Sequence, residues 1–291
     1  MARSNLMPKL LLIIFLTLFS ITVSSQSKKF YTIKDDNSYD KIIFKVKAQT
    51  GKYKITPSNR SNVIDIFGSP NHENLNPSFT SKRLDQRIRS VNFTVENLYD
   101  PILSNLVVDE SNLWEFFINE NKIYDFSFDS KIADANINLS NIPIDNIDLA
   151  SGNANLLLIY EENGENPLKM DSLKIKIEIG TLDTKNINLS NAKNIFTEIG
   201  FGNVTLDIAK NKNKSFVSKT NLSAGKIIIN LPFDDVGTKI IINNSPLSSV
   251  KLPKNFHEIE QNIFVNKLSE NNTKYVRSFI VDVGLGNITV N

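Results

Sequence analysis

The sequence predicts an all-β fold built as a stack of β-coils, a β-solenoid. The first observation is a recurring phrase in which glycine and asparagine precede a strand, at Gly152-Asn153, Gly202-Asn203 and Gly286-Asn287. The second is the strict alternation of apolar and polar residues in segments such as 174–179 and 204–208. One such coil cannot bury its apolar face alone, so we expect successive coils to stack over a continuous core.

Other segments fit the same pattern. Residues 42–46 are rich in β-formers, and residues 41–55 read as strand, glycine and strand, so a degenerate repeat can begin there. Residues 109–119 have apolar residues at helical spacing, but we favour a strand or loop that carries aromatics into the core. Strand is therefore the expected structure throughout the chain.

An internal repeat supports the stack. Residues 136–141 (NINLSN) recur letter for letter as residues 186–191, and Gly152 and Gly202 share the same offset. We expect a corner of the coil wherever the phrase recurs, where glycine permits positive φ or the close approach of a neighbour. Aligned in this way, the corners are Ala135, Gly152, Lys185, Gly202, Gly225, Ser248 and Gly286.

The alignment predicts parallel pairing of successive coils in a single-stranded right-handed β-helix-like stack. An antiparallel β-sandwich remains the alternative, since it also has short alternating strands. Two polar insertions, near residues 161–171 and 254–276, interrupt the rhythm and are the expected places for function. We also consider a side-chain ladder that joins Asn136 and Asn138 to Asn186 and Asn188.

The chain divides into three parts. Residues 1–25 have the positive start, apolar run and small-residue cleavage pattern of a signal peptide. Residues 26–100 are an irregular β-rich region, and residues 101–291 are the β-solenoid repeat domain. The sequence contains no cysteine, and no later stretch is apolar enough to span a membrane. We therefore expect a secreted protein, either periplasmic or on the cell surface.

Part of the chain resembles the bacterial toast-rack domain and the related C-terminal domain of LiaF-like cell-envelope stress proteins. The resemblance covers about residues 110–291 and rests on the Trp114-led segment 113–119, on segments 124–128, 135–140 and 144–153, and on the forms Gly200-Phe201-Gly202 and Gly284-Leu285-Gly286. It implies a β-solenoid-like fold and a non-enzymatic envelope or secreted protein, with no family catalytic residue to transfer.

The residues themselves predict no catalytic, cofactor-binding or metal site, so we expect no enzyme and no cofactor. His72 and His257 are the only histidines, and both fit surface loops. The segment from Asp134 to Asp145 begins like a calcium loop but lacks the glycine and glutamate that the loop needs. The carboxylate pairs Asp234-Asp235 and Glu161-Glu162 fit solvated loops better than a glycosidase site.

These observations predict an exported, non-catalytic envelope or surface protein, a rigid β-scaffold for partner binding, sensing or adhesion. A carbohydrate-active β-helix enzyme or glycan-binding module is the alternative, and convergence of carboxylates, basic groups and aromatics on one face would favour it. The net charge of +2 is not concentrated in a basic stripe, which argues against nucleic acid. The partner is then an envelope protein or a glycan. The chain ends on a strand, so we expect an open C-terminal coil that is covered either by the N-terminal part or by another subunit in a homo-oligomer.

Overall fold

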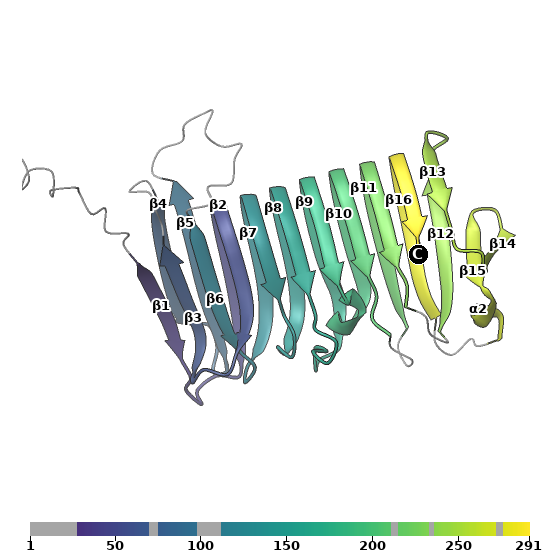
Figure 1. Cartoon of the computed structure of the whole chain (residues 1–291). Coiled ribbons are helices and arrows are strands. Elements are labelled where there is room, and N and C mark those ends of the chain that lie inside the picture. Colours follow the sequence, from purple (N-terminus) through teal and green to yellow (C-terminus); the bar gives the residue numbers. More distant parts are fainter. Residues whose placement is uncertain (1–27, 70–74, 98–111, 211–214, 233–235, 272–275) are drawn as a thin grey trace, which may run out of the picture.

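The computed structural model describes residues 28–69, 75–97, 112–210, 215–232, 236–271 and 276–291. Almost all of them are in strands, with one 3-10 turn and one short helix (Figure 1). The elements are β1 (Lys29–Lys34), β2 (Lys41–Ser58), β3 (Asn62–Ser69), β4 (Leu75–Arg83), β5 (Ile88–Asn97), β6 (Leu113–Asn119), β7 (Ile123–Asn138), β8 (Ile144–Ile159), β9 (Met170–Lys185), η1 (Ile187–Ser190), β10 (Ala192–Asp207), β11 (Phe216–Asn230), β12 (Gly237–Asn244), β13 (Ser248–Lys251), β14 (Phe256–Glu260), β15 (Ile263–Asn266), α2 (Lys267–Asn271) and β16 (Val276–Val290).

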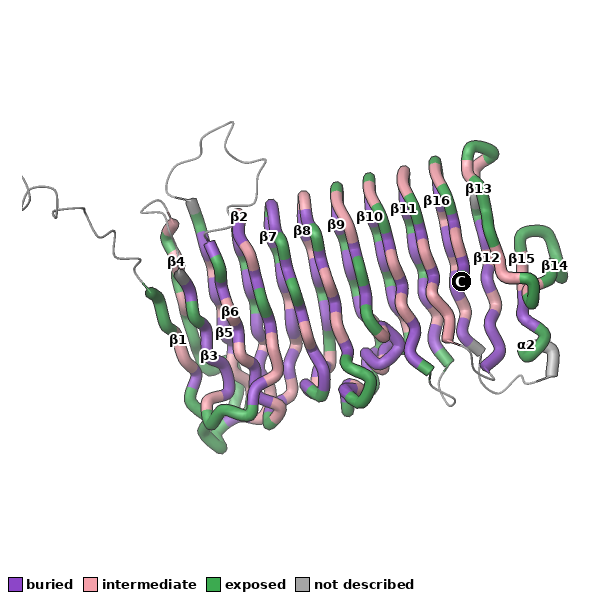
Figure 2. Tube along the Cα trace, viewed as in Figure 1, coloured by how far each residue is buried: buried purple, intermediate pink, exposed green. Residues whose placement is uncertain are grey.

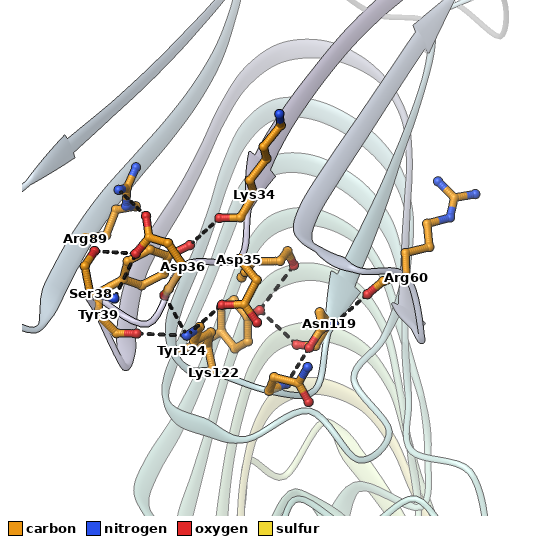
Figure 3. A network of polar contacts seen from close by, with 12 residues as sticks. Lys34, Asp35, Asp36, Ser38, Tyr39, Arg60, Arg89, Asn119, Lys122 and Tyr124 are labelled. Carbon is orange, nitrogen blue, oxygen red and sulfur yellow. Dashed lines mark hydrogen bonds and ion pairs between the residues drawn. The ribbon is translucent and has the colours of Figure 1, made fainter.

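The strands form one large, mostly parallel sheet of 16 strands that does not close on itself. The long strands β2, β7, β8, β9, β10, β11 and β16 pair in parallel, each with the next in space (Figure 1). Each of them bends near its middle, so the stack appears as nested arches when viewed along its axis (Figure 3). We call the half before the bend the first arm and the half after it the second arm.

Parallel stacking confirms the all-β, solenoid-like prediction, and the antiparallel sandwich is wrong for the stack. The degenerate repeat predicted at residues 41–55 is also confirmed, because β2 pairs with β7 through both arms. At the N-terminal end the arms part: β5 and β4 continue the first arm, while β6, β3 and β1 continue the second. Residues 113–119 form strand β6, as we favoured. The ring of Trp114 packs edge-on against that of Phe93, with the ring centroids 4.8 Å apart.

Register identifies the bend residues. Gly202, Gly225 and Gly286 lie in one register row, and Ser248 of β13 pairs with Gly286, so these four predicted corners are confirmed. The other corners are wrong. The same row passes through Gly51, Ala133, Ala154 and Gly180, in place of Ala135, Gly152 and Lys185.

The reason is that pairing with the neighbouring strand, not the local phrase, fixes the corner. Gly152 lies two residues before its bend, at the level of Gly200, the first glycine of the Gly-x-Gly form. The offset shared by Gly152 and Gly202 therefore joins two different positions of the coil. Aligning coils from sequence alone can place them in the wrong register, because neighbouring coils carry similar patterns of alternating residues.

The bend also explains how both arms face one core. In β10, Ile195, Thr197 and Ile199 are buried before the bend, and Val204 and Leu206 are buried after it. Side chains of a straight strand alternate between faces, so positions 199 and 204 would point to opposite sides. The bend inverts this alternation, and Figure 2 shows buried residues at regular intervals down every long strand.

The repeated NINLSN segments do not have equivalent structures. Asn136 and Asn138 end strand β7, whereas residues 187–190 form the 3-10 turn η1. Asn136 is exposed, but Asn188 is buried and bonds to the backbone of Ala209, so the predicted asparagine ladder is wrong. The two segments do bury the same isoleucine, leucine and serine positions, and both end on an asparagine with left-handed conformation, Asn141 and Asn191 (φ 61° and 59°).

Order along the chain differs from order in space at the C-terminal end. The last strand, β16, lies between β11 on one side and β12 and β13 on the other (Figure 1). The expectation of an open C-terminal coil is therefore wrong, because that strand is already paired along both arms. Association of copies of the chain stays a prediction. The sheet ends instead at β14, which pairs with β15, and β15 pairs with β12.

Candidate binding surface at the bends

The bends in the second half of the stack require glycine. Gly180, Gly202, Gly225 and Gly286 have φ between 140° and 147°, a region that side-chain-bearing residues rarely adopt. A Cβ at Gly202 would lie 1.7 Å from the carbonyl oxygen of Gly180, and the same contact recurs between Gly225 and Gly202. Each glycine thus accommodates the carbonyl of its neighbour, and the bends align into one straight edge of the stack.

Large apolar side chains lie exposed along this edge. The residue before each bend glycine is Ile179, Phe201, Ala224 or Leu285, and these residues pair in one register row. Ile179, Phe201 and Leu285 are 54%, 60% and 53% exposed, and Leu247, next to Ser248, is 75% exposed. In Figure 2 the upper tips of the long strands change from buried in β7 to exposed in β9, β10 and β16. We name Ile179, Phe201, Ala224, Leu285 and Leu247 the bend ridge.

A row of polar side chains borders the bend ridge on the outer face of the first arm. The polar row consists of residues paired across five neighbouring strands: Lys176, Glu198, Asn221, Asp282 and Asn243. Strands in a sheet are about 4.8 Å apart, so the four residues from Glu198 to Asn243 extend over about 14 Å. Charged and amide groups thus follow the stack axis beside apolar ones.

Four residues of the polar row, Glu198, Asn221, Asp282 and Asn243, line an open hollow of about 490 Å³. Its walls include Gly200, Ser223 and Gly284, whose small size leaves space between the polar row and the bend ridge. Lys176 pairs with Glu198 at 3.0 Å, with both side chains more than half exposed, so solvent screens this pair and it contributes little to stability. Asn221 and Asn243 present amides that can both donate and accept hydrogen bonds. The hollow suits an uncharged ligand rich in hydroxyl groups.

A second polar cluster, at the N-terminal end, has a structural role. The Lys122 ammonium forms an ion pair with Asp35 (2.8 Å) and donates to the backbone carbonyls of Asp36 and Tyr39 (3.2 and 2.9 Å; Figure 3). Hydrogen bonds from Ser38, and the charge of Arg89, lower the pKa of the Asp36 carboxyl. All three ammonium donors have partners, so this cluster fixes the turns around β2 and β7 and leaves no donor free for a ligand.

The histidines and carboxylate pairs named in the sequence analysis are not brought together into a catalytic or metal site within the described residues. His72 and Asp234-Asp235 lie outside the described residues. His257 is exposed on β14, and Glu161 pairs with Lys185 at 3.0 Å at the solvent. Over the ranges that the structure describes, no group of three or more histidine, aspartate or glutamate residues could hold a metal ion. Within those same ranges no helix has the length and apolarity of a membrane span.

The two insertions complete the stack. In the first, Asn166 is fully buried and bonds the backbone of Ile144 and Ser190, which ties the ends of neighbouring coils together. In the second, β14, β15 and α2 extend the first arm beyond β12. The bend ridge was missed at the sequence level, although its signal was visible as the large apolar residue inside Gly200-Phe201-Gly202 and Gly284-Leu285-Gly286.

Comparisons with known proteins found distant similarity to solved structures. No family model matches the chain, and no curated protein matches its sequence. Among solved structures it is similar to a proposed cell-adhesion protein from Clostridium sporogenes (15% identity, 91% of this chain and 98% of that chain, TM-score 0.43). It is also similar to a proposed lipid-binding protein from Parabacteroides distasonis (10% identity, 91% and 96%, TM-score 0.37) and to a proposed adhesin from Parabacteroides merdae (14% identity, 91% and 95%, TM-score 0.30). At these values the function must be argued from the binding surface itself.

Proposed function

We propose that the chain is an exported, non-catalytic protein of the cell envelope or cell surface that binds an extended glycan along the bend ridge and polar row. Its role is then adhesion or sensing, with the stack as a rigid scaffold. The observation that carries the proposal is the row of carboxylate and amide groups of Glu198, Asn221 and Asp282 that lines one hollow. Exposed Phe201 and Leu285 lie at the bends beside it, three residues further along the strands of Glu198 and Asp282.

The chemistry of sugars fits this surface. A sugar ring has an apolar face, which packs on an aromatic side chain such as Phe201, and hydroxyl groups, which bond to carboxylates and amides. The groups of the polar row recur about every 4.8 Å, close to the length of one sugar unit in an extended chain. The hollow is open, so a polymer can pass along it without having to enter a closed pocket.

Binding to an array of bacterial and host polysaccharides tests the proposal. We expect a subset of glycans to bind the purified exported chain, and we expect Phe201→Ser and Asn221→Ala each to weaken binding at least tenfold. Phe30→Ser is the matched control, since Phe30 is 53% exposed on β1, far along the stack from the bend ridge. Absence of glycan binding, or equal losses in Phe30→Ser, would overturn the proposal, and retention of an envelope protein alone would indicate a protein partner.

A carbohydrate-active enzyme is the second candidate, on one observation. Glu198 and Asp282 flank Asn221 in the polar row, two strand spacings apart, or about 9.6 Å between their backbones. Carboxyl groups of inverting glycosidases are about 6.5–9.5 Å apart. However, the acid catalyst of a glycosidase typically lies in a buried apolar pocket, and Glu198 is largely exposed. Release of reducing ends from a bound glycan, lost in Glu198→Gln while binding persists, would favour the enzyme.

A further inference from the structure

The sheet of the first arm ends in an open edge at each end of the molecule. Along this arm the strand order is β4-β5-β2, then the stack to β16, then β12-β15-β14. Among the described residues β4 pairs only with β5, and β14 only with β15. Each of these two strands therefore has one edge along which no other described strand pairs, and another strand can add there.

The two edges carry opposite charge. Lys82 and Arg83 are exposed at the end of β4, and Arg83 is held in place by bonds to the carbonyls of Asp85 and Gln86 (3.1 and 2.5 Å). Every residue of β14 after Phe256 is exposed, and this part of the strand includes Glu258 and Glu260. Ile259, 50% exposed, lies between them. A basic edge thus lies at one end of the arm and an acidic edge at the other.

Strand direction is also compatible. The strand β14 runs in the same direction as β16, because β12 is parallel to β16 and two antiparallel pairings follow it. The strand β4 runs in the opposite direction, since it is antiparallel to β5, which is parallel to β2. Two copies related by a shift along the stack would therefore bring β14 and β4 together as an antiparallel pair.

We propose that copies of this chain associate head to tail, with β14 of one copy pairing with β4 of the next. The pairing continues the first-arm sheet from copy to copy and places Glu258 and Glu260 beside Lys82 and Arg83. The same charges disfavour the two wrong junctions, since β14 against β14 joins glutamates and β4 against β4 joins cations. A head-to-tail contact is heterologous and extends into a filament unless the rotation between copies closes a ring.

The lysines of the second arm limit the junction to one sheet. Its ends are β1, with Lys29 and Lys34, and β13, with Lys251. These edges repel each other, so they give the junction no second strand pair. We therefore expect a weak, reversible contact in which salt screens the attraction between the edges.

Charge reversal tests this proposal in the full exported chain by sedimentation velocity over a wide range of protein concentration. We expect larger species for the unaltered chain at about 0.1 M salt and their loss at about 1 M salt. The acid-edge variant Glu258→Lys with Glu260→Lys, and the basic-edge variant Lys82→Glu with Arg83→Glu, should each be monomeric. A mixture of the two, and the chain with all four changes, should recover the larger species.

The control is Lys219→Glu with Lys226→Glu, which makes an equal charge change at exposed positions of β11. It should leave association unchanged, and Trp114 fluorescence should confirm that every variant is folded. The proposal is overturned if the unaltered chain is monomeric at all concentrations, if either edge variant still associates, or if the mixture remains monomeric. Glycan binding at the bends is measured separately, so the two proposals can fail independently.

Discussion

The two halves of the stack achieve the same bend with different residues. In β9, β10, β11 and β16, which we call the glycine half, the bend residue is glycine with φ between 140° and 147°. In β7 and β8 it is Ala133 or Ala154, and neither has positive φ. We call the part of the stack up to β8 the alanine half. Ala154 is nevertheless the residue whose carbonyl oxygen Gly180 accommodates, at 1.9 Å from a Cβ at that position. Gly51 of β2 also has positive φ (154°), but a Cβ there would lie 3.0 Å from its nearest neighbours. The comparison teaches that the carbonyl of the strand before it excludes a side chain at the bend from Gly180 onward.

The halves also differ in what the bend exposes. Ile132 of β7, one residue before its bend, is only 8% exposed, whereas its register equivalents Ile179 and Phe201 are more than half exposed. At Gly180, Gly202 and Gly286 the positive-φ glycine thus follows a large side chain that faces outward. The bend ridge is confined to the glycine half of the stack for this reason, and so is the proposed binding surface.

The largest effect should come from Gly202→Ala. The new methyl group would overlap the carbonyl oxygen of Gly180 in a backbone conformation that alanine rarely adopts, so we expect a loss of stability of about 3 kcal/mol or more. Ala154→Gly, at the equivalent bend of the other half, should cost no more than about 1 kcal/mol. Urea denaturation followed by circular dichroism measures both. Equal losses at the two positions would refute the distinction between the halves.

Alkaline pH should lower the free energy of unfolding through buried tyrosines of the N-terminal half. Burial raises the pKa values of Tyr53, Tyr124 and Tyr160, and it raises the pKa of Tyr39 to about 12. The folded state keeps these protons above pH 10, where the unfolded chain releases them, so stability falls as pH rises from about 10. The slope is about 1.4 kcal/mol per pH unit for each such phenol.

Urea titrations at about pH 8, 9.5 and 10.5, with Trp114 fluorescence as the readout, check this dependence. Tyr160→Phe should reduce the slope by one proton and leave the stability at neutral pH no lower, because the Tyr160 hydroxyl is buried without a described hydrogen-bond partner. A slope that is the same in Tyr160→Phe and the unaltered chain would contradict the assignment. These four tyrosines all precede β9, so the effect belongs to one side of the comparison.

The smallest effect concerns buried hydroxyl groups. In the alanine half, Ser130 and Ser151 bond to each other at 2.9 Å. In the glycine half, the hydroxyls of Thr197 and Thr220 are paired in register but have no hydrogen-bond partner within the described part of the chain. Ser151→Ala should therefore cost about 1 kcal/mol, whereas Thr220→Val should be neutral or stabilise by about 1 kcal/mol. Thermal unfolding of the two variants gives the sign, and a clear loss in Thr220→Val would reveal a partner such as bound water.

Local patterns in the sequence determined the element type and the stacking. Alternation in residues 174–179 and 204–208 gave strands, because side chains of period two can bury one face only when a second surface covers it. Gly202, Gly225 and Gly286 were found as corners because glycine occupies each of them. Whether the chain is exported, and how it divides into domains, stay predictions.

The tertiary structure alone decided the register and the spatial order. Ala133 and Ala154 became bends through the strands beside them, and β16 entered the stack between β11 and β12. Parallel pairing joins residues far apart in sequence, and several registers would bury similar apolar residues, so no local phrase selects among them. The candidate surface depends on that choice, because Glu198, Asn221 and Asp282 become neighbours only once three separate coils are aligned.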